Sequence, residues 1–340
     1  MKKLLTRILK TFLPLFFGLA LLWYFFYQME GRQLQVFYNA LKSANYWWVI
    51  LSVLLSIIPF FLRAERWKLN LEPMNYTTKW KNRYHSLMIG YLVNLTIPRA
   101  GEASRAVMLY RSEKVPFAKS FGTIISERLV DLLFLGSIAV LTYFLNTQNF
   151  LVLFDEIKAT FKPENSSHFK LYFYGVVGIL FAALFIAYLL KPNFRQKINT
   201  FIGGLFNGLF SIFKMKKSGL YLLYSFFIWL IYVTDFALCF YALDATAQLS
   251  FSAILLAFIA GSLGITFTNG GIGAFPLLVG IVIGIVGKDT IPDAQAVGNA
   301  LGMIIWTSQT LLVVILGVIS LLLLPKPNQE ADDTLGKTEE

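Results

Sequence analysis

Six long apolar runs constrain the fold of this chain more than any other feature. Each run reaches or exceeds the roughly 17–25 residues that a helix needs to cross a bilayer. Only 14% of the residues are charged, whereas soluble domains average about 25%. We therefore expect an all-α polytopic integral membrane protein with about six full spans. The predicted spans are Thr11–Tyr27, Tyr46–Leu62, Phe117–Leu145, Phe169–Leu190, Leu220–Leu243 and Ala294–Leu324.

The positions of the basic residues predict an orientation. Of the 30 lysines and arginines, 23 lie before the first span, in alternate connections or in the C-terminal tail. Such a bias places those segments, and with them both termini, in the cytoplasm. We expect a multi-pass protein of a bacterial cytoplasmic (inner) membrane. The net charge of +11 is then a topology signal and an attraction for anionic headgroups, and no nucleic-acid partner is expected.

Two further apolar stretches are too short or too broken to be simple spans. Tyr84–Pro98 has about 14 apolar-leaning residues, and a second amphipathic piece follows it. Phe251–Thr268 ends at a glycine-rich break and is followed by another short apolar run. Broken helices at membrane depth need protein or water to satisfy their backbone groups. We therefore predict re-entrant or broken helical hairpins at about residues 84–112 and 251–286.

The spans that follow the two hairpins open on a similar pattern. Pro116-x-Ala118-x-x-x-Gly122 opens one of them, and Pro292-x-Ala294-x-x-x-Gly298 opens the other. Three spans separate the hairpins, so the second unit would be inverted relative to the first. Paired interruptions in inverted halves indicate a transporter binding site. Chance similarity between apolar helices is the alternative. We treat residues 1–325 as a single transmembrane domain and residues 326–340 as a disordered cytoplasmic tail.

Glu127, Arg128 and Asp131 stand inside an otherwise apolar span. Ionised groups at membrane depth are costly and face a partner or water. On a helix the two carboxylates share one face, and Arg128 can pair with Asp131. The tip of the first hairpin should lie against this helix start, and there Arg99, Arg105 and Arg128 are the candidate phosphate partners.

Glu102 begins the helix after the Pro98–Gly101 break, where the helix dipole favours an anion. It is spaced to pair with Arg105, and a capped, solvated helix start is the alternative for this segment. In the predicted site, Glu102, Glu127 and Asp131 would orient the arginines or bind a cationic aminoacyl headgroup.

The second half contributes weaker candidates. Asp235 either lines the same site, pairs with Arg128, or is a hydrogen-bonded structural residue. The glycine-rich break adds Asn269, Gly270, Gly271 and Gly273 as candidate substrate-binding residues. Gly280-x-x-x-Gly284 and Gly298-x-x-x-Gly302 permit close helix approach, and we expect them to serve packing.

Three motifs carry a family resemblance. Pro98-x-x-Gly101-Glu102-x-x-Arg105, Glu127-Arg128-x-x-Asp131 and Gly270-Gly271-x-Gly273 resemble the lysylphosphatidylglycerol synthase transmembrane-region family. This family corresponds to the flippase-like membrane domain of multiple peptide resistance factor proteins and includes UPF0104-type membrane proteins. The resemblance implies a protein that binds or flips lipids, often aminoacylated phosphatidylglycerol. The chain departs from the family pattern at Thr268 and at Pro276, where the pattern has a proline and a glutamate.

The bifunctional relatives also carry a soluble aminoacyl transferase domain, and we expect no synthase activity from this chain. No nucleotide-binding, metalloprotease or nucleophile motif is present, so we expect neither an enzyme nor a cofactor or metal. The leading hypothesis is a lipid flippase or lipid-binding transporter for a phospholipid or an aminoacylated or glycosylated lipid. The alternatives are a membrane-embedded transferase on lipid-linked substrates and a non-transporting scaffold that presents lipid.

The expected partners follow from this hypothesis. They are anionic or aminoacylated membrane phospholipids, with a second copy of the chain and a separate lipid-modifying enzyme as candidate protein partners.

Overall fold

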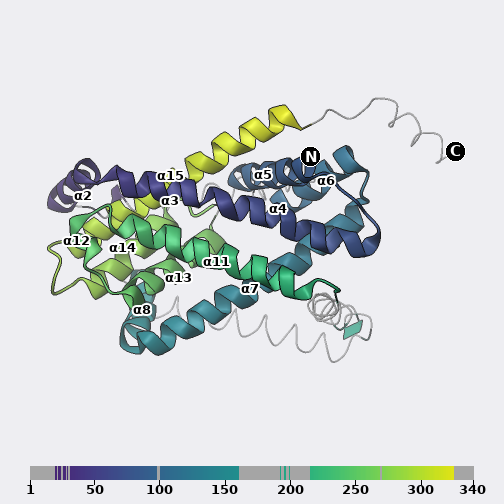
Figure 1. Cartoon of the computed structure of the whole chain (residues 1–340). Helices are drawn as coiled ribbons and strands as arrows, with labels where there is room; N and C mark the ends of the chain where they lie inside the picture. Colours follow the sequence, from purple (N-terminus) through teal and green to yellow (C-terminus); the bar gives the residue numbers. More distant parts are fainter. Residues whose placement is uncertain are drawn as a thin grey trace.

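A computed structural model describes residues 31–97, 100–160, 215–268 and 270–324, together with scattered positions between 20 and 29 and between 192 and 199. This part of the chain is helical and contains no strand (Figure 1). The helices before the gap at 161–191 are α2 Gly31–Ser43, α3 Tyr46–Leu55, α4 Ile57–Leu71, the short η1 Glu72–Met74, α5 Trp80–Thr96, α6 Gly101–Glu113, α7 Phe117–Leu145 and α8 Thr147–Thr160. Those after it are α11 Ser218–Phe240, α12 Asp244–Ala247, α13 Phe251–Phe267, α14 Ala274–Val286 and α15 Ala294–Leu323.

The described residues contain three helices long and apolar enough to cross a membrane. They are Tyr46–Met74, Ser218–Phe240 and Ala294–Leu323. A fourth is added if Phe117–Leu145 and the start of α8, which are bent by 112°, form one span. The predicted all-α membrane fold is confirmed. Of the six predicted spans, Phe169–Leu190 and most of Thr11–Tyr27 lie outside the described residues.

The helix that begins at Tyr46 is longer than the sequence predicted. The expected span ended at Leu62, but α4 continues to Leu71 and buries Arg63 and Arg66. The prediction ended the span at the first arginine because an unpaired charge is costly in a membrane. Partner carboxylates on α7 remove that cost. These two arginines are therefore buried residues in the middle of α4, whereas the prediction placed them in a cytoplasmic loop.

Each predicted hairpin is a pair of short helices, and the two helices of each pair pack on each other. In the first, α5 and α6 approach so closely that a Cβ on Gly90 would lie 2.8 Å from the carbonyl oxygen of Gly101. The Gly101 amide begins α6 and donates to Asn94 Oδ1 at 2.7 Å. The hydrogen bond fixes the turn between the two helices, because it satisfies an N–H that has no partner within α6.

The turn between α13 and α14 depends on its glycines. Gly270, Gly271 and Gly273 have φ values of 63°, 82° and 71°, a region that glycine enters without steric cost. The Gly270 carbonyl accepts a hydrogen bond from Trp306 Nε1 of α15 at 2.7 Å. A Cβ on Gly270 would lie 3.0 Å from Leu95 of α5, so this turn meets the end of α5.

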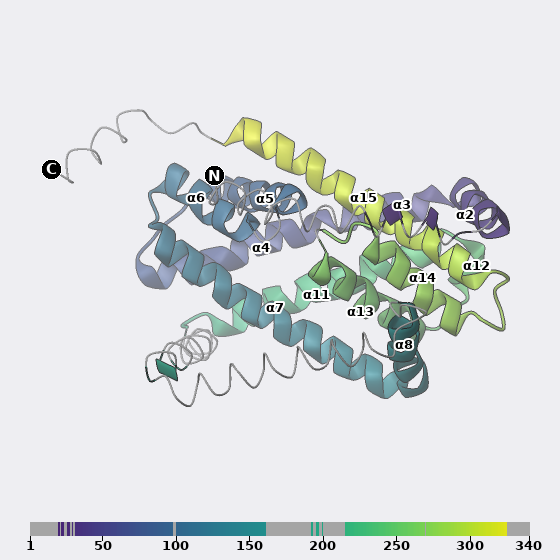
Figure 2. The ribbon, with the colours of Figure 1, turned by 180° about the vertical axis from the view of Figure 1, so that it is seen from behind.

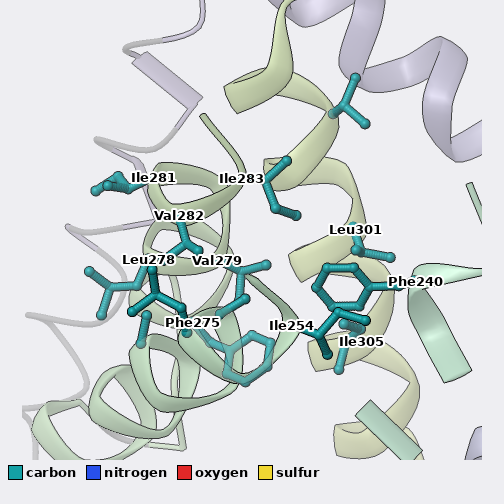
Figure 3. Packing of buried hydrophobic residues seen from close by; sticks show 14 of the residues in the cluster. Phe240, Ile254, Phe275, Leu278, Val279, Ile281, Val282, Ile283, Leu301 and Ile305 are labelled. Atoms are coloured by element: carbon teal, nitrogen blue, oxygen red, sulfur yellow. The ribbon is translucent and has the colours of Figure 1, made fainter. Parts of the chain in front are cut away.

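The larger apolar core joins the second hairpin to α15, as Figure 3 shows for residues such as Phe275, Val279 and Leu301. Glycines make this contact close. A Cβ on Gly298 would lie 2.9 Å from the Cα of Gly280, and one on Gly302 would lie 2.7 Å from the Cα of Pro276. The prediction that these glycines serve packing is confirmed.

The helix α15 also contacts the first hairpin (Figure 2), further along its length. A Cβ on Gly317 would lie 2.7 Å from Leu92 Cβ, and His85 Nδ1 is 3.0 Å from Ser320 Oγ. Apolar side chains cover much of the outer surface. Leu322, Trp47 and Phe144 are between 75% and 80% exposed, as a protein in contact with lipid requires.

Candidate functional site

Five charged side chains are buried together where α4, α6 and α7 meet. Two arginines come from α4, one arginine comes from α6, and two carboxylates come from α7. We call this group the arginine cluster. Its members are Arg63, Arg66, Arg105, Glu127 and Asp131, each at most 6% exposed.

Asp131 is held by the two arginines of α4. Its Oδ2 accepts from Arg63 Nη1 at 2.8 Å, and its Oδ1 accepts from Arg66 Nη1 at 2.8 Å. Arg63 and Arg66 are three residues apart and therefore share one face of α4. The carboxylate connects α4 to α7 in the interior.

Glu127 pairs with Arg105 through two hydrogen bonds. Arg105 Nη1 and Nη2 donate to the two carboxylate oxygens at 2.8 Å and 3.2 Å. The Arg105 guanidinium also stacks over the Trp67 ring, 3.7 Å from its centroid. Such bidentate charged pairs are strong and fix the orientation of both groups. This pair connects the first hairpin to α7.

The neighbouring face of α11 adds polar groups to the cluster. Tyr232 OH accepts from Arg63 Nε at 3.0 Å, and Ser225 Oγ accepts from Arg66 Nη1 at 2.9 Å. The Arg66 guanidinium lies over the Tyr221 ring, 5.4 Å from its centroid. Helix α11 therefore forms part of the surroundings of the cluster and packs beside α4 (Figure 1).

The cluster contains three arginines but only two carboxylates, so it carries one surplus positive charge. Some of its donors also lack acceptors among the described residues: Arg66 Nε, Arg66 Nη2 and Arg105 Nε are buried there without a hydrogen-bond partner. Arg66 Nη2 lies 3.9 Å from Glu127 Oε2, beyond hydrogen-bond distance. A buried donor without a partner costs about 1–3 kcal/mol. The arrangement has the charge and donors to bind an anion.

A partly exposed ion pair lies next to the cluster. Arg128 Nε is 3.3 Å from Glu102 Oε1, and Arg128 Nη1 is 3.7 Å from Asp131 Oδ2. The Arg128 and Glu102 side chains are 39% and 24% exposed. Arg128 is therefore the cation of this group that solvent or lipid reaches most readily.

The structure brings together five of the predicted site residues but replaces one of the predicted pairings. Glu102 pairs with Arg128 and not with Arg105, and Arg105 pairs with Glu127. Arg128 contacts Asp131 as predicted, but Arg63 and Arg66 lie closer to that carboxylate. The prediction paired neighbours in sequence because it had no means to place α4 against α7.

Other predicted site residues do not join the cluster. Asp235 Oδ2 lies 2.6 Å from Ser56 Oγ, and Asp235 makes no ion pair with Arg128 within the described residues. Gly270, Gly271 and Gly273 shape the turn that meets Leu95 and Trp306. Arg99 and Asn269 lie outside the described residues.

Sequence reasoning missed Arg63 and Arg66 and assigned them to a loop. A signal was available, since Arg63, Arg66, Trp67 and Asn70 recur at intervals of three and four residues. This spacing puts them on one helix face, as it did for the carboxylates of α7. Within the described part of the chain no group of three histidine, cysteine or carboxylate side chains is placed to hold a metal ion.

Comparison with known proteins agrees with this membrane architecture. The sequence profile of the lysylphosphatidylglycerol synthase TM region matches residues 11–317. The chain belongs to this family. A UPF0104 membrane protein of Methanocaldococcus jannaschii is 30% identical over 96 residues, which are 27% of this chain and 29% of that protein. The match therefore covers less than a third of the relative's length. No solved structure matches the chain. Family membership is consistent with a membrane lipid-related role.

Proposed function

We propose that this protein is a lipid flippase or lipid-binding transporter that takes the anionic headgroup of a phospholipid at the arginine cluster. The observation that carries the proposal is the surplus positive charge of the cluster, together with its buried donors. A guanidinium presents a planar fork that matches phosphate oxygens. A headgroup phosphate would supply both the negative charge and the acceptors that Arg66 and Arg105 lack.

The exposed pair gives the headgroup a first contact. Arg128 is the accessible cation, and Glu102 holds it beside Asp131. A phosphate that displaces Glu102 from Arg128 would reach the arginines behind it, and the released Glu102 would then be free to bind a cationic aminoacyl group. The acyl chains would remain in the lipid that surrounds the apolar surface.

We further propose the orientation that the basic residues predict, with both termini in the cytoplasm of an inner membrane. The two hairpins would form the two halves of an inverted repeat. One ion pair supports this scheme: Lys217 Nζ lies 3.1 Å from Glu72 Oε2. The end of α4 is therefore next to the start of α11, and the predicted topology puts both on the cytoplasmic side.

Lipid binding by matched variants tests the proposal. Arg66→Lys keeps the positive charge but loses the planar fork, and Arg111→Lys makes the same change at an exposed position of α6. Protein purified in mild detergent should retain phosphatidylglycerol in preference to phosphatidylcholine, measured by lipid mass spectrometry. Arg66→Lys should lose this preference and Arg111→Lys should keep it. Equal retention by both variants would contradict a headgroup site at Arg66.

Reconstituted vesicles separate transport from the alternative functions. A flippase redistributes fluorescent phosphatidylglycerol between leaflets without changing its mass. Conversion of the lipid to a product of different mass would identify a transferase instead. Bound lipid without redistribution would identify a scaffold. Either of these outcomes overturns the transport proposal.

A further inference from the structure

A second buried polar group includes Asp235, which follows Tyr232 by three residues, about one turn, along α11. It forms where α11, α15 and the junction of α3 with α4 meet. Asp235 of α11, 7% exposed, contacts Ser56 at the junction, and Gln309 Nε2 of α15 donates to Ser56 Oγ at 2.9 Å. We call Asp235, Ser56 and Gln309 the carboxyl triad.

Asp235 differs from the carboxylates of the cluster because it has no cation. Glu127 and Asp131 are each held by arginines, whereas no ion pair within the described residues includes Asp235. The helices packed on α11 supply no cation that pairs with it among the described residues: α13 and α15 contain no ionisable residue, and α3 contains only Tyr46. Arg63 and Arg66 of α4 pair with Asp131, and Arg128 of α7 pairs with Glu102 and Asp131. Cys239 and Tyr232 are its titratable neighbours on α11, and Tyr232 OH accepts from Arg63. A buried carboxyl without a cation is stable only in its neutral form.

The hydrogen bonds of Ser56 also indicate that Asp235 is protonated. Ser56 Oγ lies 2.8 Å from the Ser52 carbonyl oxygen and 2.6 Å from Asp235 Oδ2. A hydroxyl has one hydrogen and can donate to only one of these oxygens. When Ser56 donates to Ser52 and accepts from Gln309, its second lone pair can accept a hydrogen from the carboxyl. All three contacts are then satisfied, provided that Asp235 carries a proton.

We propose that Asp235 is a proton-binding site whose loading and release accompany lipid transport. The O–H bond forms with a proton taken from water on one side of the membrane. It breaks when that proton passes to water on the other side, and no other covalent bond changes. A proton gradient across the membrane is the energy source, so the coupling rests on the proposed transport function.

Helix α4 provides the physical connection between the two sites. Ser56 lies at the break between α3 and α4, and Arg63 follows it by seven residues, about two turns along α4. Proton loss would leave a carboxylate that needs the Ser56 hydrogen, so the Ser56 hydroxyl would turn from the Ser52 carbonyl to Asp235. In the proposed coupling, loss of this hydrogen bond at the break lets α4 shift and carry Arg63 and Arg66, which hold Asp131. The proton site and the headgroup site share this helix.

Infrared spectroscopy tests the proton without any transport assay. Wild-type protein at neutral pH should show the C=O stretch of a protonated carboxyl, and this band should shift in D2O. Asp235→Asn should lose the band completely, whereas Asp244→Asn, at an exposed position of α12, should keep it. If Asp235→Asn does not fold, Ser56→Ala should shift the band to higher frequency. A wild-type spectrum without the band, or a band that survives in Asp235→Asn, overturns the proposal.

Vesicles with an imposed pH gradient test the coupling. The gradient should bias fluorescent phosphatidylglycerol toward one leaflet in wild-type and Asp244→Asn vesicles. Asp235→Asn should lose this bias completely while it still retains bound phosphatidylglycerol. If wild-type protein redistributes the lipid equally with and without the pH gradient, the coupling is refuted but the flippase proposal is not. Failure of wild-type protein to move lipid refutes the flippase proposal instead, while the infrared result still decides whether Asp235 holds a proton.

Discussion

Neutralising Asp131 should destabilise the protein more than neutralising any exposed carboxylate. Asp131→Asn keeps the shape of the side chain but removes the charge that Arg63 and Arg66 each approach to 2.8 Å. Removing one partner of a buried ion pair costs about 3–5 kcal/mol, because a charge is left without compensation. The matched change is Glu102→Gln, whose partner Arg128 is 39% exposed. An exposed pair contributes about 0–1 kcal/mol.

Thermal unfolding in detergent measures the difference. For a chain of this size, about 1 kcal/mol corresponds to about 2 °C in the melting temperature, so Asp131→Asn should melt about 6–10 °C below the wild type. Glu102→Gln should stay within about 2 °C. Asp131→Asn should bind phosphatidylglycerol more tightly than the wild type, because it adds one positive charge to the cluster. Equal melting temperatures for the two variants would mean that solvent screens the cluster, and the argument from burial would fail.

Three further outcomes are expected. Gly298→Val should abolish folded yield, because its Cβ would lie 2.6 Å from Ile283 Cβ, whereas Gly122→Ala, whose Cβ meets nothing within 4 Å, should raise stability by about 0.5–1 kcal/mol. Trp306→Phe should lower stability by about 1 kcal/mol through the lost hydrogen bond to Gly270, as seen in the same melting assay. In a Cys239→Ala background, a cysteine at Lys288 should react with an impermeant reagent from outside intact cells, and the reverse accessibility would overturn the proposed orientation.

The sequence predicted the elements of this fold well because a bilayer leaves few choices. Runs such as Leu220–Leu243 and Ala294–Leu324 correspond closely to α11 and α15, since length and apolar composition decide them. The two hairpins were also predictable, because Gly101 and the Gly270–Gly273 segment interrupt helices where the neighbouring sequence stays apolar. The short helices α2 and α8 were not predicted, since each lies in a connection and has mixed composition.

The pairing of charges could not be read from the chain. Glu127 and Asp131 indicated a buried site because carboxylates in an apolar helix need partners. Their true partners, Arg105, Arg66 and Arg63, lie between 22 and 68 residues away in sequence. Which arginine meets which carboxylate depends on how α4 and α6 pack on α7. Arg63 and Arg66 indicated a loop because burying either charge without a partner is unfavourable. Only the packed structure shows that both are paired with Asp131.

The two glycine contacts of α15 restrict how the molecule can change shape. Gly298 and Gly302 meet α14, and Gly317 meets α5 about four turns further along the helix. A Cβ on Gly298 would lie 2.9 Å from the Cα of Gly280, and one on Gly317 would lie 3.2 Å from the carbonyl oxygen of Met88, so backbone approaches backbone at both contacts. Sliding α15 along either hairpin would therefore break close packing. The helix ties the two hairpins together, and their relative position changes only if α15 separates from one of them.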